Sequence, residues 1–396
     1  IDQESKLIEN IINVYDVMGV CGNGASYEVQ KEAEVGKADL LIATTSSDEI
    51  NILACLVAKK LGVAHTIARI RNPEYETQLR FMRGELGLTM SINPEKAAAH
   101  EIARVLRCPA AMKLESFSKG RLELVEYRLP ENSALNGVQL LDIYKNARAR
   151  VLICAVSRKG ETTIPSGDFQ LKSGDKIYVT AAPDQLSAFF QYLGVFRKKA
   201  STVMIVGASK MSYYLADELL HMGMSVKIID QNEARCTQIS EQLPRALVIQ
   251  GDGTDSELLA EEGIADMDAF VALTGLDETN IILAMYASQF NHCKVVAKIN
   301  RKSFADVVTE RGLVDSLVST GAVTTELIVQ YVRAMQHQTG AAVTLHRIAD
   351  GRAEALEFIV NKQSKYIGEP LVVAVSAAGL DFRDVAHIDV LIRLDV

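Results

Sequence analysis

The feature that most limits how this chain can fold is an internal duplication. Four segments of the first half reappear in the second half at a spacing of about 229 residues. The matching pairs are 21–26 with 250–255, 38–45 with 267–274, 48–51 with 277–280, and 68–71 with 297–300. The sequence therefore predicts two copies of one structural unit, with the same elements in the same order.

The stretch 201–230 shows what kind of unit is repeated. An apolar run at 203–206 breaks at Gly207, a helical pattern follows at 213–220, and a second apolar run ends on Asp230. Strand, glycine turn, helix, strand and acid in this order are typical of the mononucleotide-binding half of a Rossmann fold. Such a turn lets the backbone approach phosphates, and the following helix N-terminus offers them free N–H groups.

We therefore predict a cofactor-binding turn formed by Gly207, Ala208, Ser209, Lys210 and Met211. The turn departs from the full fingerprint, which has glycine where this chain has Ser209 and Ser212, and Lys210 and Met211 crowd a diphosphate. The alternative interpretation is a Rossmann half that is retained for packing alone.

The repeats predict an α/β fold class with a parallel sheet covered on both faces. Residues 121–180 differ, because short strands there are separated by turn glycines, which indicates a small α+β domain. In the second copy 354–358 and Gly368 align with 123–127 and Gly137, whereas 372–396 has no counterpart. We predict two tandem Rossmann-like lobes at 1–108 and 199–338, each followed by a small α+β C-lobe, at 109–198 and 339–396.

The first copy starts late in the repeat. If Asp2 corresponds to Asp230, about 28 residues with the first strand and its glycine turn should precede Ile1. We expect that sequence to exist, because a sheet without its central strand would not pack; the alternative is a first lobe without a phosphate turn. A similar loss after Leu371 would explain why the second copy fades.

Composition excludes several function classes. A net charge of −8 argues against a nucleic-acid surface, and 48% hydrophobic with 23% charged residues is ordinary for a globular protein. The six cysteines form no CxxC pair and no metal-ligand spacing, which favours buried thiols in a reducing cytosol. Since no apolar run approaches the length of a membrane span, we predict a soluble protein without a metal site.

Candidate ligand contacts fall at strand ends in both copies. The acids Asp2 and Asp230 are placed to accept ribose hydroxyls, or are simply solvated strand ends. Four candidates follow a buried strand: Thr45, Ser46, Thr274 and Gly275. Arg69 and Lys298 follow the next strand and could neutralise a phosphate. Asn23 and Asp252 occupy glycine-flanked turns where they could meet an adenine edge. The alternatives are a surface ion pair for the cations and ordinary β-turns for Asn23 and Asp252.

Taken in order, these segments resemble the family of Trk-type potassium-uptake regulatory subunits of bacteria and archaea. The resemblance is carried by 68–75, 48–51 and 251–254, is extended by 206–207, 213–216, 165–168 and 174–175, and covers about residues 1–371. It implies two tandem RCK units, each a nucleotide-binding N-lobe with a C-lobe. The implied cofactors are NAD+ or NADH, or the adenine nucleotides ATP and ADP. The implied partner is a membrane-embedded potassium channel or transporter subunit, gated from the cytoplasmic face of a prokaryotic plasma membrane.

Three other interpretations fit the sequence less well. An NAD-dependent oxidoreductase needs a proton donor or nucleophile, and Tyr27 with Lys31 has a reductase spacing but lies in a charged helical segment. A calcium site at 251–257 lacks the EF-hand spacing, and a purely structural protein does not explain the acids at both strand ends. We therefore expect a ligand sensor rather than an enzyme, assembled as a dimeric or tetrameric ring. Apolar faces at 97–106 and 326–335 are the candidate contacts between subunits.

Overall fold

The computed structural model describes residues 1–75, 78, 87–107, 113–117, 121–194, 200–290, 293–301, 308, 314–336, 342–348, 352–359 and 389–393. The chain forms two compact units, Ile1–Ala97 and Ala98–Val396. The boundary between the units falls inside helix α5 (Pro94–Arg107). Within the described residues, no helix is both long enough and apolar enough to cross a membrane.

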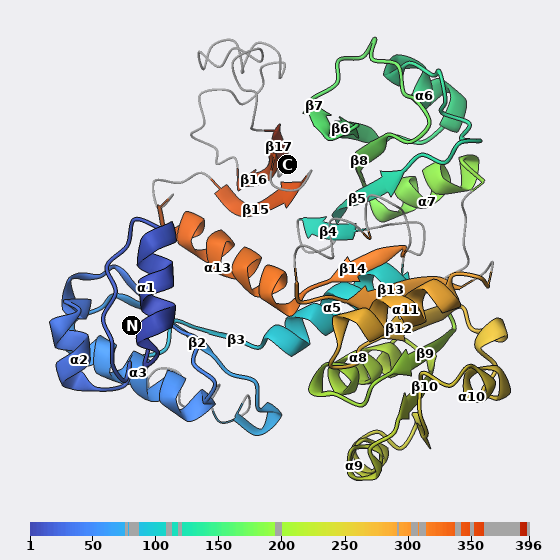
Figure 1. Cartoon of the computed structure of the whole chain (residues 1–396). Helices are drawn as coiled ribbons and strands as arrows, with labels where there is room; N and C mark the ends of the chain where they lie inside the picture. Colours follow the sequence, from blue (N-terminus) through green and yellow to red (C-terminus); the bar gives the residue numbers. More distant parts are fainter. Residues whose placement is uncertain are drawn as a thin grey trace, which may run out of the picture. The chain divides into compact units, whose positions relative to one another are not determined.

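The second unit contains a six-stranded parallel sheet (Figure 1). Its strand order is β11-β10-β9-β12-β13-β14, which is the order of a doubly wound nucleotide-binding fold. The strands are β9 (Thr202–Val206), β10 (Ser225–Asp230), β11 (Leu247–Gln250), β12 (Ala269–Ala272), β13 (Lys294–Lys298) and β14 (Ser316–Val318). The connecting helices are α8 (Lys210–His221), α9 (Glu233–Gln242), α10 (Ser256–Glu261) and α11 (Asp277–Ala287), with a short 3-10 helix η3 (Ile264–Asp266).

Both faces of this sheet are covered, which explains why its central strands β9 and β12 are almost wholly apolar. Val203 and Ile205 of β9 face a cluster that includes Leu215 of α8, whereas Met204 of β9 faces a second cluster with Leu283 of α11. Alternate residues of a strand point to opposite faces, so a strand buried on both sides has no polar face. The parallel sheet predicted from the repeat is confirmed.

Helix α5 of the first half is packed into the core of the second sheet. Ile102 and Leu106 are fully buried and belong to the same cluster as Val203 and Leu219, and Val105 is buried as well. The prediction that this apolar face meets another subunit is therefore wrong, because the face is already covered within the chain. The corresponding residues of α13 (Thr320–Gln336) are half-buried.

The first unit repeats the arrangement of the last three strands of this sheet, β12-β13-β14. Its parallel sheet has the order β1-β2-β3, formed by β1 (Leu40–Ala43), β2 (His65–Arg69) and β3 (Met90–Ile92), with helices α1 (Ser5–Val14), α2 (Tyr27–Glu32) and α3 (Asp48–Leu61) and a 3-10 helix η1 (Val35–Lys37). A parallel bridge joins Asp2 to Cys21, as Asp230 of β10 pairs with Gln250 of β11 in the second copy. The described residues of this unit include no counterpart of β9.

The C-lobes are smaller sheets in the second unit. The first, in the order β4-β5-β8-β6-β7, is antiparallel and carries two helices; its elements are β4 (Lys113–Phe117), β5 (Leu122–Arg128), α6 (Leu140–Ala147), β6 (Leu152–Arg158), β7 (Glu161–Thr163), β8 (Lys176–Ala181) and α7 (Pro183–Tyr192). The second has the order β15-β16-β17, formed by β15 (Ala342–Ile348), β16 (Ala353–Ile359) and β17 (Asp389–Arg393).

The predicted alignment of 354–358 with 123–127 falls on the equivalent strands β16 and β5. The two C-lobe sheets share a buried cluster that includes Cys154 and Tyr178 of the first and Ile348 and Ala353 of the second. Gly368 and most of 372–396 lie outside the described residues, and within 389–393 strand β17 pairs in parallel with β16.

Candidate functional site

The first residue of the turn after β9, Gly207, can only be glycine. Gly207 has φ of +107°, a backbone conformation that L-residues rarely adopt. A Cβ atom there would lie 2.7 Å from the carbonyl oxygen of Leu273 and 3.0 Å from the amide nitrogen of Thr274. The backbone that follows β12 therefore lies directly against the turn that follows β9, at the carboxyl edge of the sheet.

The two serines that depart from the glycine fingerprint form the N-cap of α8. Ser212 N–H donates to Ser209 Oγ at 3.2 Å, and Ser209 N–H donates to Ser212 Oγ at 3.3 Å, a reciprocal capping box. Within the described residues, no acceptor pairs with the N–H groups of Lys210 and Met211, so these donors remain open at the helix N-terminus. The Lys210 side chain is exposed, whereas the Met211 side chain lies in the core.

Asp230 ties the second strand to this turn. Its Oδ2 accepts a hydrogen bond from Ala208 N–H at 2.6 Å, and its Oδ1 accepts one from Asn232 N–H at 2.8 Å. In the first lobe Asp2 Oδ1 accepts from Glu4 N–H at 3.0 Å, which repeats the bond to Asn232. Each acid therefore bonds the backbone two residues after it, and Asp230 also joins two loops of the site.

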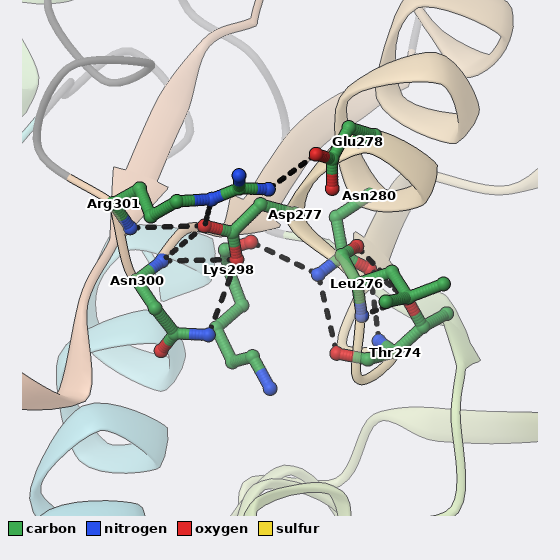
Figure 2. Close-up of polar contacts among 8 residues, drawn as sticks. All are labelled: Thr274, Leu276, Asp277, Glu278, Asn280, Lys298, Asn300 and Arg301. Atoms are coloured by element: carbon green, nitrogen blue, oxygen red, sulfur yellow. Dashed lines mark hydrogen bonds and ion pairs between the residues drawn. The ribbon is translucent and has the colours of Figure 1, made fainter.

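A buried asparagine connects the next two strand ends in each lobe, and Figure 2 shows this network in the second lobe. Asn280 Oδ1 accepts from the N–H of Thr274 at 2.8 Å and from its Oγ1 at 2.7 Å. Asn280 Nδ2 donates to the carbonyl oxygens of Thr274 at 3.3 Å and Lys298 at 2.9 Å. Because Lys298 ends β13 and Thr274 follows β12, one carboxamide holds both loops.

The first lobe contains the same network. Asn51 Oδ1 accepts from Thr45 N–H at 2.7 Å and from Thr45 Oγ1 at 2.8 Å, and Asn51 Nδ2 donates to the carbonyl oxygens of Thr45 at 3.1 Å and Arg69 at 2.8 Å. The Arg69 guanidinium also donates to the Thr45 carbonyl oxygen at 2.7 Å. Both asparagines are fully buried. The predicted residues Thr45 and Arg69, and Thr274 and Lys298, are thus brought together.

A buried aspartate at the start of the next helix fixes the loop after the following strand. Asp277 accepts from the backbone N–H of Asn300 at 3.0 Å and from that of Arg301 at 2.9 Å (Figure 2). Burial alone would raise the pKa of Asp277, but these N–H groups and the Arg301 guanidinium outweigh it and hold the pKa below its usual value. Asp48 makes the equivalent bonds to Arg71 and Asn72.

These asparagines and aspartates were not predicted as site residues. Segments 48–51 and 277–280 served as markers of the repeat, and 48–51 also as a marker of the family resemblance. Nothing in a single sequence shows that their side chains reach the backbone of a later loop. Their recurrence at the duplication spacing was the available signal, because buried polar side chains are retained where they are fully hydrogen-bonded.

The remaining candidates make local bonds. Asn23 Oδ1 accepts from Ala25 N–H at 3.0 Å, and Asp252 Oδ1 accepts from Thr254 N–H at 2.9 Å, so both form the turns that were the alternative interpretation. Hydrogen bonds from the backbone and then the side chain of Thr254 lower the pKa of Asp252. Ser46 and Gly275 follow the clamped threonines on the surface.

The donors and acceptors of the second lobe fit a nucleotide. A glycine turn of close approach, open helix N–H groups and a carboxylate beside them match phosphate and ribose in chemistry. Among the described residues, no three His, Cys, Asp or Glu side chains are arranged to hold a metal ion.

Comparisons with known proteins identify relatives of the whole arrangement. The family described as TrkA-N domain matches residues 1–94 and 203–320, which confirms the internal duplication, and the TrkA-C domain family matches 124–194. Trk system potassium uptake protein trkA homolog 1 of Methanosarcina mazei is 32% identical over 364 residues, covering 90% of this chain and 87% of that protein. Trk system potassium uptake protein TrkA of Halomonas elongata is 31% identical over 377 residues, covering 94% and 81%.

Solved structures show the same fold. The GsuK channel superimposes with a TM-score of 0.63 at 20% identity, covering 89% of this chain and 62% of that chain. A structure described as GsuK channel bound to NAD has a TM-score of 0.61 at 21% identity, with the same coverage. This chain therefore spans less than two thirds of the GsuK polypeptide.

Proposed function

The chain belongs to the TrkA family of Trk system potassium uptake proteins, and on that premise we propose that it is a nucleotide-sensing regulatory subunit. In this proposal its Rossmann-like lobes bind NAD+ or NADH, or the adenine nucleotides ATP and ADP. Binding gates a membrane-embedded potassium channel or transporter subunit from the cytoplasmic face of a prokaryotic plasma membrane.

The observation that carries this proposal is the bond between Asp230 and the turn at Gly207. The carboxylate lies 2.6 Å from Ala208 N, beside a glycine that allows close approach and beside the open N–H groups of Lys210 and Met211. A nucleotide would place its phosphates over those N–H groups and its ribose hydroxyls on the free lone pairs of Asp230. The fold neighbour described as bound to NAD supports the same ligand class.

The first lobe supports a second site. Thr45 and Arg69 are held by Asn51 as Thr274 and Lys298 are held by Asn280. Asp2 forms a parallel bridge with Cys21 at the position where Asp230 pairs with Gln250. We assign Asp2 the ribose-binding role in that lobe, with Arg69 as the cation that faces phosphate.

Sensing requires that the nucleotide binds two arrangements of the protein with unequal affinity. We propose a homo-oligomeric ring, dimeric or tetrameric, whose two arrangements differ in their effect on the membrane partner. Moving such an equilibrium from 1:99 to 99:1 takes about 5.5 kcal/mol of differential binding free energy. Several sites in one ring, each contributing about 1–2 kcal/mol, supply that amount.

The test is potassium flux through the family's membrane subunit, reconstituted in vesicles with and without this protein. We expect flux to depend on the protein and to change when NADH, NAD+, ATP or ADP is added. Flux that is insensitive to every nucleotide, together with measurable hydride transfer from NADH to a substrate, would instead favour an NAD-dependent oxidoreductase.

A further inference from the structure

The hydroxyl groups of Thr274 and Thr45, each bonded to an asparagine, cannot donate a hydrogen bond to a ligand. Thr274 Oγ1 lies 2.7 Å from Asn280 Oδ1 and 3.2 Å from the carbonyl oxygen of Leu276, and both of these atoms only accept hydrogen bonds. Leu276 N–H donates to the same hydroxyl at 3.3 Å. Since a hydroxyl has one proton and two lone pairs, the capacity that remains open is that of an acceptor.

Asn280 fixes the direction of these hydrogen bonds, because its own amide oxygen and both of its amide protons are already bonded. Asn280 Oδ1 receives two donors, and its Nδ2 gives both protons to carbonyl oxygens, so the amide cannot be flipped without losing four bonds. The N–H of Thr274 is also consumed by Asn280. The first lobe repeats the pattern, where Thr45 Oγ1 lies 2.8 Å from Asn51 Oδ1 and 3.2 Å from the carbonyl oxygen of Ser47.

An acceptor at this position discriminates between the parts of a nucleotide. Phosphate oxygens only accept hydrogen bonds. A phosphate therefore could not bond to Thr274 Oγ1, which also has only an acceptor left to offer. A sugar hydroxyl, an amine or a carboxamide can donate to it. A ligand that presents a donor at this half-buried hydroxyl gains a hydrogen bond, whereas a ligand that presents only acceptors does not.

The turn at Gly207 sets which part of a ligand reaches Thr274. Asp230 bonds Ala208 on one side of this turn, and the backbone of 273–274 lies against Gly207 on the other. If ribose is held by Asp230 and phosphate by the turn, a mononucleotide ends at the turn. A dinucleotide continues past the phosphates and presents a second sugar.

We propose that Asn280 is a positioning residue that makes the second lobe selective for dinucleotides, by holding the Thr274 hydroxyl as an acceptor for a donor group on the second nucleoside. Asn51 has the same role toward Thr45 in the first lobe. This inference rests on the proposed nucleotide-binding function, and it names the part of the ligand that the carboxyl edge of β12 recognises.

The experiment compares NADH and ADP binding to the full chain by isothermal titration, with separate sites fitted where two appear. Thr274→Val removes the acceptor and keeps the side-chain shape, and Thr274→Ser restores it. We expect Thr274→Val to weaken NADH binding about tenfold while ADP binding changes less than about twofold. Thr274→Ser should bind both ligands as the unmodified protein does.

Asn280→Ala tests the positioning role directly. The variant frees the Thr274 proton, so the ratio of NADH affinity to ADP affinity should fall even though the threonine is present. Ile282→Ala, an exposed position on the same helix, is the control and should leave this ratio unchanged. ADP titration of each variant separates a loss of selectivity from a folding defect, because a folding defect would weaken both ligands alike.

Equal weakening of NADH and ADP by Thr274→Val, or no weakening of either, overturns the inference and leaves the proposed function standing. Failure of the unmodified protein to bind any of NADH, NAD+, ATP or ADP overturns the proposed function and this inference with it.

Discussion

The carboxylate of Asp230 and the backbone N–H of Ala208 are joined by a hydrogen bond of 2.6 Å, so the acid that ends β10 also shapes the turn that follows β9. Without this carboxylate the turn N–H would lose its charged acceptor. In the proposed site the same carboxylate would also bind ribose, so local structure and the proposed ligand binding depend on one side chain.

Asp230→Ala should weaken NADH binding about tenfold or more, because charge-assisted hydrogen bonds contribute about 1.5–3 kcal/mol. Isothermal titration of the full chain measures this. Glu241→Ala, which removes an exposed acid from α9, controls for the change in net charge. Asp2→Ala examines the first lobe in the same way, and unchanged affinity for every nucleotide in both aspartate variants would show that these acids do not bind ligand.

Gly207→Ala should destabilise the second lobe and abolish its nucleotide binding. A left-handed backbone costs a non-glycine residue about 1–2 kcal/mol, and here the added Cβ would also lie 2.7 Å from the Leu273 carbonyl oxygen. Gly223→Ala is the control: Gly223 also has a positive φ, but nothing lies within 4 Å of the Cβ that the substitution would add. The midpoint of urea unfolding should fall further for Gly207→Ala than for Gly223→Ala; equal shifts would contradict the close approach.

Asp277→Ala should loosen the loop after β13. The substitution leaves the N–H groups of Asn300 and Arg301 without their carboxylate, at a cost of about 1–3 kcal/mol for each unsatisfied group that stays buried. Amide hydrogen exchange at these two residues should become faster. Ile282→Ala, at an exposed position on the same helix that makes no bond to either residue, should leave their exchange rates nearly unchanged. Equal acceleration by both variants would point to fraying of α11 instead.

The stability of the second unit should depend on pH through Glu101 of α5. Burial raises the pKa of Glu101 from 4.5 to about 7; Lys113 of β4 and Arg104 oppose the rise, whereas Glu115 of β4 and Glu326 of α13 add to it. The folded state then holds more protons than the unfolded state between about pH 4.5 and 7, so its stability falls as pH rises through this window.

Urea unfolding of the full chain at intervals from pH 5 to 8 measures this dependence. Glu101→Gln keeps the side-chain size and removes the titration, so the stability difference between this variant and the unmodified protein should grow in favour of the variant as pH rises. A difference that is constant over the whole range would assign the pH dependence to other groups.

The elements of the second sheet were predictable because their signals are local. Apolar runs, a glycine and a terminal acid identify β9, α8 and β10 from sequence alone. The partner of helix α5 was not predictable, since helical periodicity reveals an apolar face but not the core that covers it. Ser209 and Ser212 depart from the glycine fingerprint, and the sequence does not show that each bonds the other's backbone to cap the helix.

The clamping role of Asn51 and Asn280 escaped prediction for a different reason. Each amide bonds a strand end 18 residues away in the sequence. No local rule pairs an asparagine in the first turns of a helix with the carbonyl group of a later strand. The duplication marked the positions as important for the unit, and only the folded structure shows which atoms they join.

The burial of α5 against the second sheet has a consequence for synthesis of the chain on the ribosome. The helix ends at Arg107, whereas the sheet that covers its apolar face is complete only at Val318 of β14. At about 5–20 residues per second, the intervening roughly 210 residues take about 10–40 s to emerge. The packing of Ile102 and Leu106 is complete only after that time, so the nascent chain exposes an apolar helix face for most of its translation. Chaperones that bind apolar segments should therefore bind this helix.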